Sequence, residues 1–166
     1  GIGLLPSDRR AGKHGARIMG RSMKIKKVAI IGSGQMGCGI AQVAALAGFD
    51  ILLNDIDAER VERGIATVSG NLAKAVAAGK ITEEAGKAAL GRIKPAPAYE
   101  ALADADLVIE AATENEATKR KIYNAVCPVL KPDAILATNT SSISITRLAS
   151  ATDRAERFMG IHFMNP

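Results

Sequence analysis

Aromatic side chains are scarce in this chain of 166 residues, which has three Phe, two Tyr and no Trp. The interior must therefore be built mainly from Ala, Val, Ile and Leu. Cysteine is equally sparse, and Cys38 and Cys127 are isolated thiols without metal-ligand spacing. We expect neither a disulfide nor a metal site, and the free thiols are typical of a cytoplasmic protein.

Long apolar runs are also missing. No stretch approaches the roughly 20 apolar residues that a membrane-spanning helix needs, so no membrane partner is expected. In contrast, 48% of the residues are hydrophobic and 23% are charged, which is typical of one soluble globular domain.

The formal net charge of +5 comes mostly from residues 1–22, which hold five basic residues and one acid. The remainder is nearly neutral and poor in aromatics, so it lacks the electrostatic footprint of a nucleic-acid-binding protein. Residues 1–22 show no sustained hydrophobic period. We interpret them as a leader or non-native extension without regular structure, and 23–166 as one folded domain. A mitochondrial transit peptide, with a location in the mitochondrial matrix, is the alternative.

From residue 27 onward, short apolar runs alternate with longer stretches of helical pattern. The run KVAII is continuous, β-branched and followed by Gly32, which is typical of a buried parallel strand. Asp57, Thr82 and Asn115 stand where helix caps are expected. The expected strands are 27–31, 50–53, 107–111, 134–137 and 158–163, and the expected helices are 36–47, 58–78, 83–93 and 116–126.

This alternation predicts an α/β domain of the Rossmann type, with a doubly wound parallel sheet and right-handed crossovers. The two helices between Asp57 and Ile93 are longer than one crossover requires. We therefore expect them to project as an inserted helical hairpin. Pro95 and Pro97 indicate an edge element or a loop.

A glycine-rich loop follows the first strand and opens the first helix. It consists of Gly32, Ser33, Gly34, Gln35, Met36 and Gly37. In a dinucleotide-binding loop the first glycine permits the tight turn, the second lets the pyrophosphate approach, and the third lets the helix pack on the sheet. The helix N-terminus then presents free N–H groups to the phosphates. We predict that this loop binds the cofactor.

Asp55 follows Gly32 by 23 residues, at the end of the second strand. This is close to the spacing of about 20 residues expected for the acid that binds the adenosine ribose. A carboxylate there accepts hydrogen bonds from the ribose hydroxyls and repels a 2′-phosphate. The predicted cofactor is therefore NAD.

Polar side chains follow three further strands. Glu114, with Lys119 beyond it on the following helix, comes after 107–111, where doubly wound folds bind ligands. Glu110 sits further back and can be structural, and Lys119 can equally be a solvated surface residue. Asn139 and Ser141 follow the next strand, where a helix cap is the alternative. His162 follows the last strand, and a histidine beside apolar residues is often a core residue.

Together these motifs resemble the NAD-binding domain of the L-3-hydroxyacyl-CoA dehydrogenase family, especially its bacterial 3-hydroxybutyryl-CoA type. The resemblance runs through VAIIGSGQMGCGIA, LLNDID, LVIEAATEN, TNTSSISIT and GIHFMNP, in that order. It implies that His162 is the catalytic base and that Ser141 binds the substrate beside the cofactor. The resemblance further implies that the residues near the nicotinamide half of NAD are Glu114, Lys119, Asn139 and Asn165.

The resemblance also shows departures. Met164 stands where the family more often has a second Phe, and the acid that orients the histidine falls after Pro166. The family's helical C-terminal domain, which makes the homodimer and closes over the substrate, is absent from this chain. The family's CoA contacts map weakly to Asn71 and Lys74, and Ala78 stands where a lysine is expected.

The predicted reaction is oxidation of (S)-3-hydroxyacyl-CoA to 3-oxoacyl-CoA with NAD as hydride acceptor, in fatty acid or butanoate metabolism. Because the acid and the second domain are missing, we expect this chain to have little activity alone. One alternative is another β-hydroxyacid dehydrogenase, although those enzymes usually have a lysine base. A non-enzymatic NAD-binding protein of crystallin or sensor type is the other.

Overall fold

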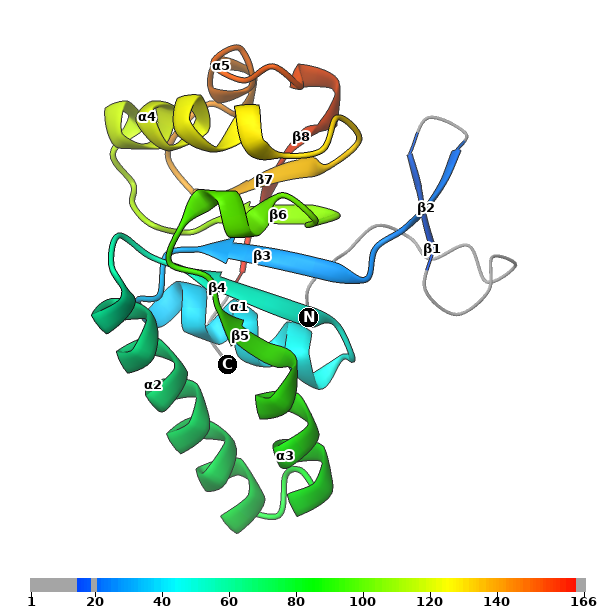
Figure 1. Cartoon of the computed structure of the whole chain (residues 1–166), viewed down its shortest axis with the longest axis vertical. Helices are drawn as coiled ribbons and strands as arrows, with labels where there is room; N and C mark the ends of the chain where they lie inside the picture. Colours follow the sequence, from blue (N-terminus) through cyan, green and yellow to red (C-terminus); the bar gives the residue numbers. More distant parts are fainter. Residues whose placement is uncertain (1–14, 19–20, 164–166) are drawn as a thin grey trace.

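The computed structural model describes residues 15–18 and 21–163. Its centre is a sheet of six parallel strands in the order β5-β4-β3-β6-β7-β8 (Figure 1). The chain moves outward from β3 to one edge and then returns to build the other half from β6. This order confirms the predicted doubly wound sheet. The strands are β3 (Lys27–Ile31), β4 (Asp50–Asn54), β5 (Ile93–Pro95), β6 (Leu107–Glu110), β7 (Ile135–Asn139) and β8 (Phe158–Ile161).

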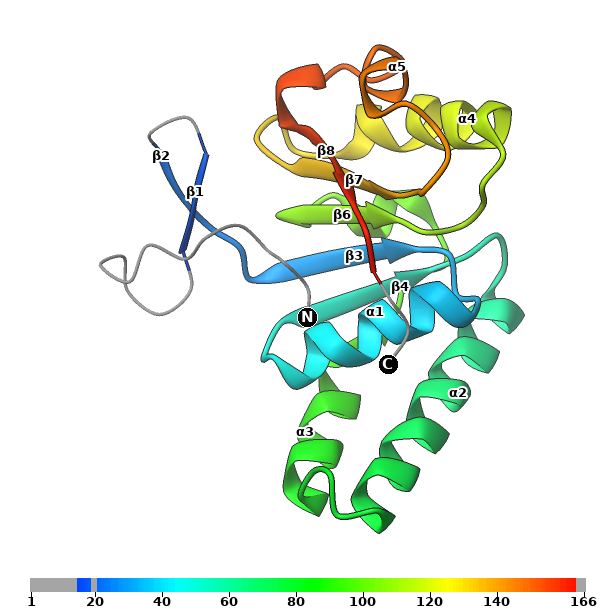
Figure 2. The same ribbon diagram turned by 180° about the vertical axis from the view of Figure 1, so that it is seen from behind.

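Helices cover both faces of the sheet. In Figure 2, α1 lies across one face, whereas α4 and α5 lie on the opposite side. Successive residues of β3 point into the two separate cores, Val28 and Ile30 toward α1 and Ala29 and Ile31 toward α4. The helices are α1 (Gln35–Leu46), α2 (Ala58–Ala77), α3 (Glu83–Arg92), α4 (Glu116–Val126) and α5 (Ile145–Ala149).

The three predicted helix caps are confirmed. The side chain of Asp57 accepts a hydrogen bond from the Arg60 N–H, and Thr82 and Asn115 cap α3 and α4 in the same way. Each cap satisfies an N–H group that has no partner within its helix. α5 was not predicted, because five residues are too few to show a helical period.

The predicted helical hairpin is formed by α2 and α3, which extend beyond the β5 edge of the sheet (Figure 1). Arg92 at the end of α3 donates a hydrogen bond to the Ala45 carbonyl of α1 over 2.7 Å. The hairpin is therefore tied to the same helix that begins at the glycine-rich loop. Pro95 lies in the edge strand β5, where its missing N–H leaves no ladder bond broken.

The ends of the chain differ from expectation. Gly15–Ile18 (β1) and Arg21–Lys24 (β2) pair antiparallel, although no regular structure was expected in 1–22. Pairing through backbone hydrogen bonds requires no hydrophobic period, so residues 1–22 carry no periodic signal for this ribbon. β8 ends at Ile161, two residues earlier than predicted, and residues 1–14, 19–20 and 164–166 lie outside the described part.

Candidate functional site

The glycine-rich loop joins β3 to α1 and owes its shape to the absence of two side chains. A Cβ on Gly32 would lie 2.8 Å from the Ala111 carbonyl, and the φ of Gly32 is +109°. A Cβ on Gly37 would lie 1.7 Å from the Gly32 oxygen. Only glycine therefore allows the tight turn and the close contact of α1 with it.

Gly34 has a different role, because a Cβ there would meet no atom within 4 Å. Its backbone faces open space at the start of α1. The first turn of α1 carries neither an acidic residue nor a side-chain cap. Its free N–H groups and positive dipole end are therefore available to an anion such as a pyrophosphate.

A cavity of about 460 Å³ lies beside this loop, where β3 and its neighbours β4 and β6 end. This is the point where the strand order reverses, at which doubly wound sheets bind ligands. Five of the predicted cofactor residues line this cavity, namely Gly32, Gly34, Gln35, Met36 and Asp55. Its size is that of a small-molecule site, and the glycine cradle fits a dinucleotide.

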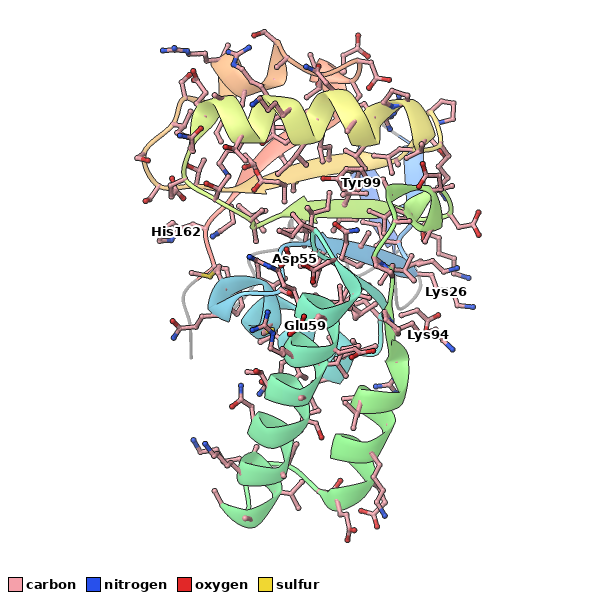
Figure 3. The ribbon with its side chains drawn as sticks, turned by 60° about the vertical axis from the view of Figure 1, so that its left-hand side comes forward. Lys26, Asp55, Glu59, Lys94, Tyr99 and His162 are labelled. Atoms are coloured by element: carbon pink, nitrogen blue, oxygen red, sulfur yellow. The ribbon has the colours of Figure 1, made fainter. Side chains whose placement is uncertain are left out.

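Asp55 lies at the wall of this cavity, near the centre of Figure 3. Its Oδ2 accepts hydrogen bonds from the N–H (2.8 Å) and the hydroxyl (2.7 Å) of Ser33, and its Oδ1 accepts one from the N–H of Ile56 (2.7 Å). Burial raises the pKa of Asp55, but these bonds and the nearby Arg60 lower it more, so the net pKa is below its usual value. The carboxylate is therefore ionised and fixed in position.

Arg60, Gly64 and Tyr99 were not predicted as site residues, and Ser33 was predicted only as part of the glycine-rich loop. Ser33 lies inside the glycine motif, and its hydroxyl donates a hydrogen bond to Asp55. Gly64 of α2 packs closely on Ser33, because a Cβ on Gly64 would lie 2.8 Å from the Ser33 Cβ. Arg60 and Tyr99 line the cavity itself, whereas Ser33 and Gly64 do not. Burial and the charges of Asp55 and Glu110 raise the pKa of Tyr99, which therefore stays neutral. Tyr99 lies in a single 3-10 turn (Tyr99–Leu102), which is too short to produce a periodic pattern in the sequence.

A fully buried ion pair lies beneath the loop that follows β6. The Lys119 ammonium is 2.7 Å from Glu110 Oε1, and both side chains are 0% exposed. Tyr123, Thr138 and the N–H of Ala112 also donate to the Glu110 carboxylate. Glu110 is thus a buried residue that joins β6, α4 and β7, and its charge is fully paired.

Lys119 is not a solvated surface residue, so that alternative is wrong. Besides Glu110, its ammonium donates to the Thr138 hydroxyl (3.1 Å) and to the Asn139 carbonyl (3.4 Å). Its three protons therefore have acceptors within the protein. The sequence placed Lys119 on the correct element but contained no signal that Glu110 is its partner.

Three further hydrogen bonds connect the loops at the carboxyl edge. The Glu114 carboxylate accepts from the hydroxyls of Thr140 (2.8 Å) and Ser142 (2.9 Å), which links the loops after β6 and β7. The Asn139 side-chain oxygen accepts from the Phe163 N–H over 3.2 Å, which links the ends of β7 and β8. Because Phe163 is buried against the α1 side, the adjacent His162 is held at this edge.

Ser141 and His162 follow the neighbouring parallel strands β7 and β8. Both are exposed, and Figure 3 shows His162 at the end of β8, on the same edge of the sheet as Asp55. Neither lines the 460 Å³ cavity. Asn165 lies outside the described residues. Asn71 and Lys74 are exposed on the distal half of α2, one helical turn apart and outside the cavity lining.

Within 15–18 and 21–163, no helix is both long and apolar enough to span a bilayer. The same residues contain no group of three or more His, Cys, Asp or Glu side chains arranged to hold a metal ion.

The model of one protein family, "3-hydroxyacyl-CoA dehydrogenase, NAD binding domain", matches residues 27–166. The chain belongs to this family. The match confirms the resemblance of the sequence and identifies the cofactor of the domain as NAD. The glycine cradle and the ionised, fixed Asp55 are the features of this structure that fit NAD.

Similar proteins agree with this assignment. A 3-hydroxybutyryl-CoA dehydrogenase of Bradyrhizobium diazoefficiens is 63% identical over 142 residues, which are 86% of this chain and 48% of the relative. The structure of the (S)-3-hydroxybutyryl-CoA dehydrogenase of Ralstonia eutropha has a TM-score of 0.83 and 45% identity, and the match covers 86% of this chain and 50% of that one. A fatty acid oxidation complex subunit alpha of Psychrobacter cryohalolentis is 42% identical over 99% of this chain and 23% of its own length. The chain thus spans about half the length of the two 3-hydroxybutyryl-CoA dehydrogenases.

Proposed function

We propose that this chain is the NAD-binding part of a dehydrogenase that oxidises (S)-3-hydroxyacyl-CoA to 3-oxoacyl-CoA. One observation carries the proposal beyond cofactor binding. Ser141 and His162 follow adjacent strands at the same sheet edge as Asp55, and the Asn139–Phe163 hydrogen bond holds the histidine segment there. The names of the relatives at 63% and 45% identity support the same substrate class.

In the proposed reaction the glycine-rich loop and Asp55 would hold NAD, which would supply the hydride acceptor for the carbon that bears the substrate hydroxyl. The His162 imidazole takes the proton of that hydroxyl, because a neutral imidazole nitrogen accepts a proton and histidine is the side chain most often used as a general base. The Ser141 hydroxyl donates a hydrogen bond to the same oxygen and holds it beside His162. The carbonyl product forms as the O–H and C–H bonds break.

The other predicted site residues have supporting parts in this proposal. Glu114 and Asn139 fix the loops after β6 and β7. The proposed role of Asn165 is a contact with the nicotinamide half of NAD. Lys119 acts through Glu110, Thr138 and Asn139, which are its hydrogen-bond partners. Asn71 and Lys74 on the exposed face of α2 contact the CoA moiety.

The partner of the domain in this proposal is the C-terminal half that the relatives possess, which supplies the acid for His162 and the dimer contact. The test is a chimera in which residues 27–166 are joined to the C-terminal half of the Bradyrhizobium relative. We expect it to oxidise NADH with acetoacetyl-CoA and to ignore free acetoacetate. Turnover of the free acid at a similar rate indicates a different β-hydroxyacid dehydrogenase. A folded, dimeric chimera without turnover indicates a non-enzymatic protein.

A further inference from the structure

The Asp55 carboxylate fills a site that is itself built to bind an anion. Three donors converge on it, namely the N–H and the hydroxyl of Ser33 and the N–H of Ile56, at distances of 2.7–2.8 Å. Two of them are backbone groups, so their positions do not depend on the side chain at residue 55. Removing the carboxylate therefore leaves the two backbone N–H groups without an acceptor, and the Ser33 hydroxyl keeps only the Arg60 carbonyl oxygen, 3.0 Å away.

A cation stands beside these donors. Arg60 lines the same cavity, and its charge lowers the pKa of Asp55. Its contact with Asp57 spans 3.8 Å, and the two side chains are 53% and 54% exposed, so this ion pair holds the guanidinium weakly. Arg60 also lies in the first turn of α2, where the helix dipole disfavours a cation. Its guanidinium is thus free to turn toward an anion at residue 55.

From this geometry we infer that Arg60, Ser33 and the Ile56 N–H form a latent 2′-phosphate site, which the Asp55 carboxylate occupies and thereby closes to NADP. Asp55 then selects NAD in two ways. Its carboxylate accepts hydrogen bonds from the ribose hydroxyls, and it occupies the hydrogen-bond donors that a 2′-phosphate would need. An arginine with several N–H donors is the side chain best suited to a phosphate oxygen pair. This inference rests on the NAD site and not on the dehydrogenase reaction.

The matched variants are Asp55→Ala, which empties the anion site, and Asp55→Asn, which removes the charge but keeps the site filled. If charge repulsion alone excluded NADPH, both variants would bind it equally well. We expect Asp55→Ala to bind NADPH at least about tenfold more tightly than the unchanged chain, a gain typical of one or two charge-assisted hydrogen bonds. Asp55→Asn should show no such gain. Asp57 and Glu59 limit the gain of Asp55→Ala, because their carboxylates repel the 2′-phosphate.

The role of Arg60 is tested in the Asp55→Ala background. Adding Arg60→Ala should abolish the gain in NADPH affinity, whereas Arg63→Ala, an exposed arginine on the same helix, should leave it in place. Adenosine 2′-monophosphate should compete with NADPH in Asp55→Ala, and adenosine 5′-monophosphate should compete much less.

Fluorescence titration of the chain with NADH and NADPH measures all of these affinities, and a thermal melt shows that each variant is folded. Asp55→Ser serves as a second variant that empties the site. A folded Asp55→Ala and Asp55→Ser that bind NADPH no better than Asp55→Asn would overturn the inference. So would a gain that survives Arg60→Ala. If the unchanged chain binds neither cofactor, the cofactor assignment itself is wrong, which is a separate outcome.

Discussion

Replacing Lys119 by Met would remove one partner of the buried ion pair and leave the Glu110 carboxylate without its cation. Breaking a buried pair in this way typically costs about 3–5 kcal/mol of unfolding free energy. Three donors remain on Glu110, from Ala112, Tyr123 and Thr138, so we expect the lower end of that range. For a domain of this size a loss of about 3 kcal/mol lowers the thermal midpoint by about 6–12 °C.

The assay is thermal unfolding followed by circular dichroism, with urea unfolding as an independent measure of the free energy. Lys121→Met is the matched control, because Lys121 is exposed on the same helix, and it should change the stability by about 0.5 kcal/mol or less. The double variant Glu110→Gln/Lys119→Met should lose clearly less than the sum of its two single variants. A Lys119→Met midpoint within about 2 °C of the unchanged chain, or strictly additive losses, refutes the described coupling.

The remaining predictions concern the cofactor site and the N-terminal segment. Gly37→Ala should prevent native folding, because its Cβ would lie 1.7 Å from the Gly32 oxygen, whereas Gly34→Ala should fold and bind NADH more weakly; melting curves and NADH titrations separate the two. Because the pKa of Asp55 is lowered in the folded state, its contribution to stability is complete above the unfolded value of about 3.9 and is lost as the pH falls through the folded value. Asp55→Asn should therefore flatten the fall in stability below about pH 4, and an unchanged slope in acid-unfolding curves contradicts this. Deleting residues 1–22 should leave both the thermal midpoint and the NADH affinity unchanged, and a fall in either shows that the segment packs on the domain.

The parts of the fold that depend on local sequence were predictable. KVAII before Gly32 indicates a buried strand, and Asp57 and Asn115 indicate helix starts, because these signals arise from a residue and its immediate neighbours. The helix α5 and the 3-10 turn that carries Tyr99 escaped prediction, because each is too short to show a period. Their positions are determined by packing against distant strands.

The site residues, too, could be predicted where the signal is local and not where it depends on distant strands. Gly32, Gly37 and Asp55 could be named from their spacing after strands, and the structure brings the glycine loop and Asp55 together at one cavity. The partners of Lys119 could not be named, because Glu110 and Thr138 come from two different strands whose pairing the sequence does not state. The anion site around Asp55 was missed for a similar reason, since two of its three donors are backbone N–H groups that no residue type reveals.

His162 is the proposed base of an NAD-dependent dehydrogenase. The most direct test is the turnover of acetoacetyl-CoA by the chimera with and without His162→Ala, with the affinity for NADH measured in parallel. A positioned base is typically worth about 10²–10⁴ in rate, so turnover should fall by that factor. The NADH affinity should stay the same, because His162 lies outside the cavity beside the glycine-rich loop. Near-normal turnover by His162→Ala would contradict the mechanism and leave this chain with cofactor binding alone.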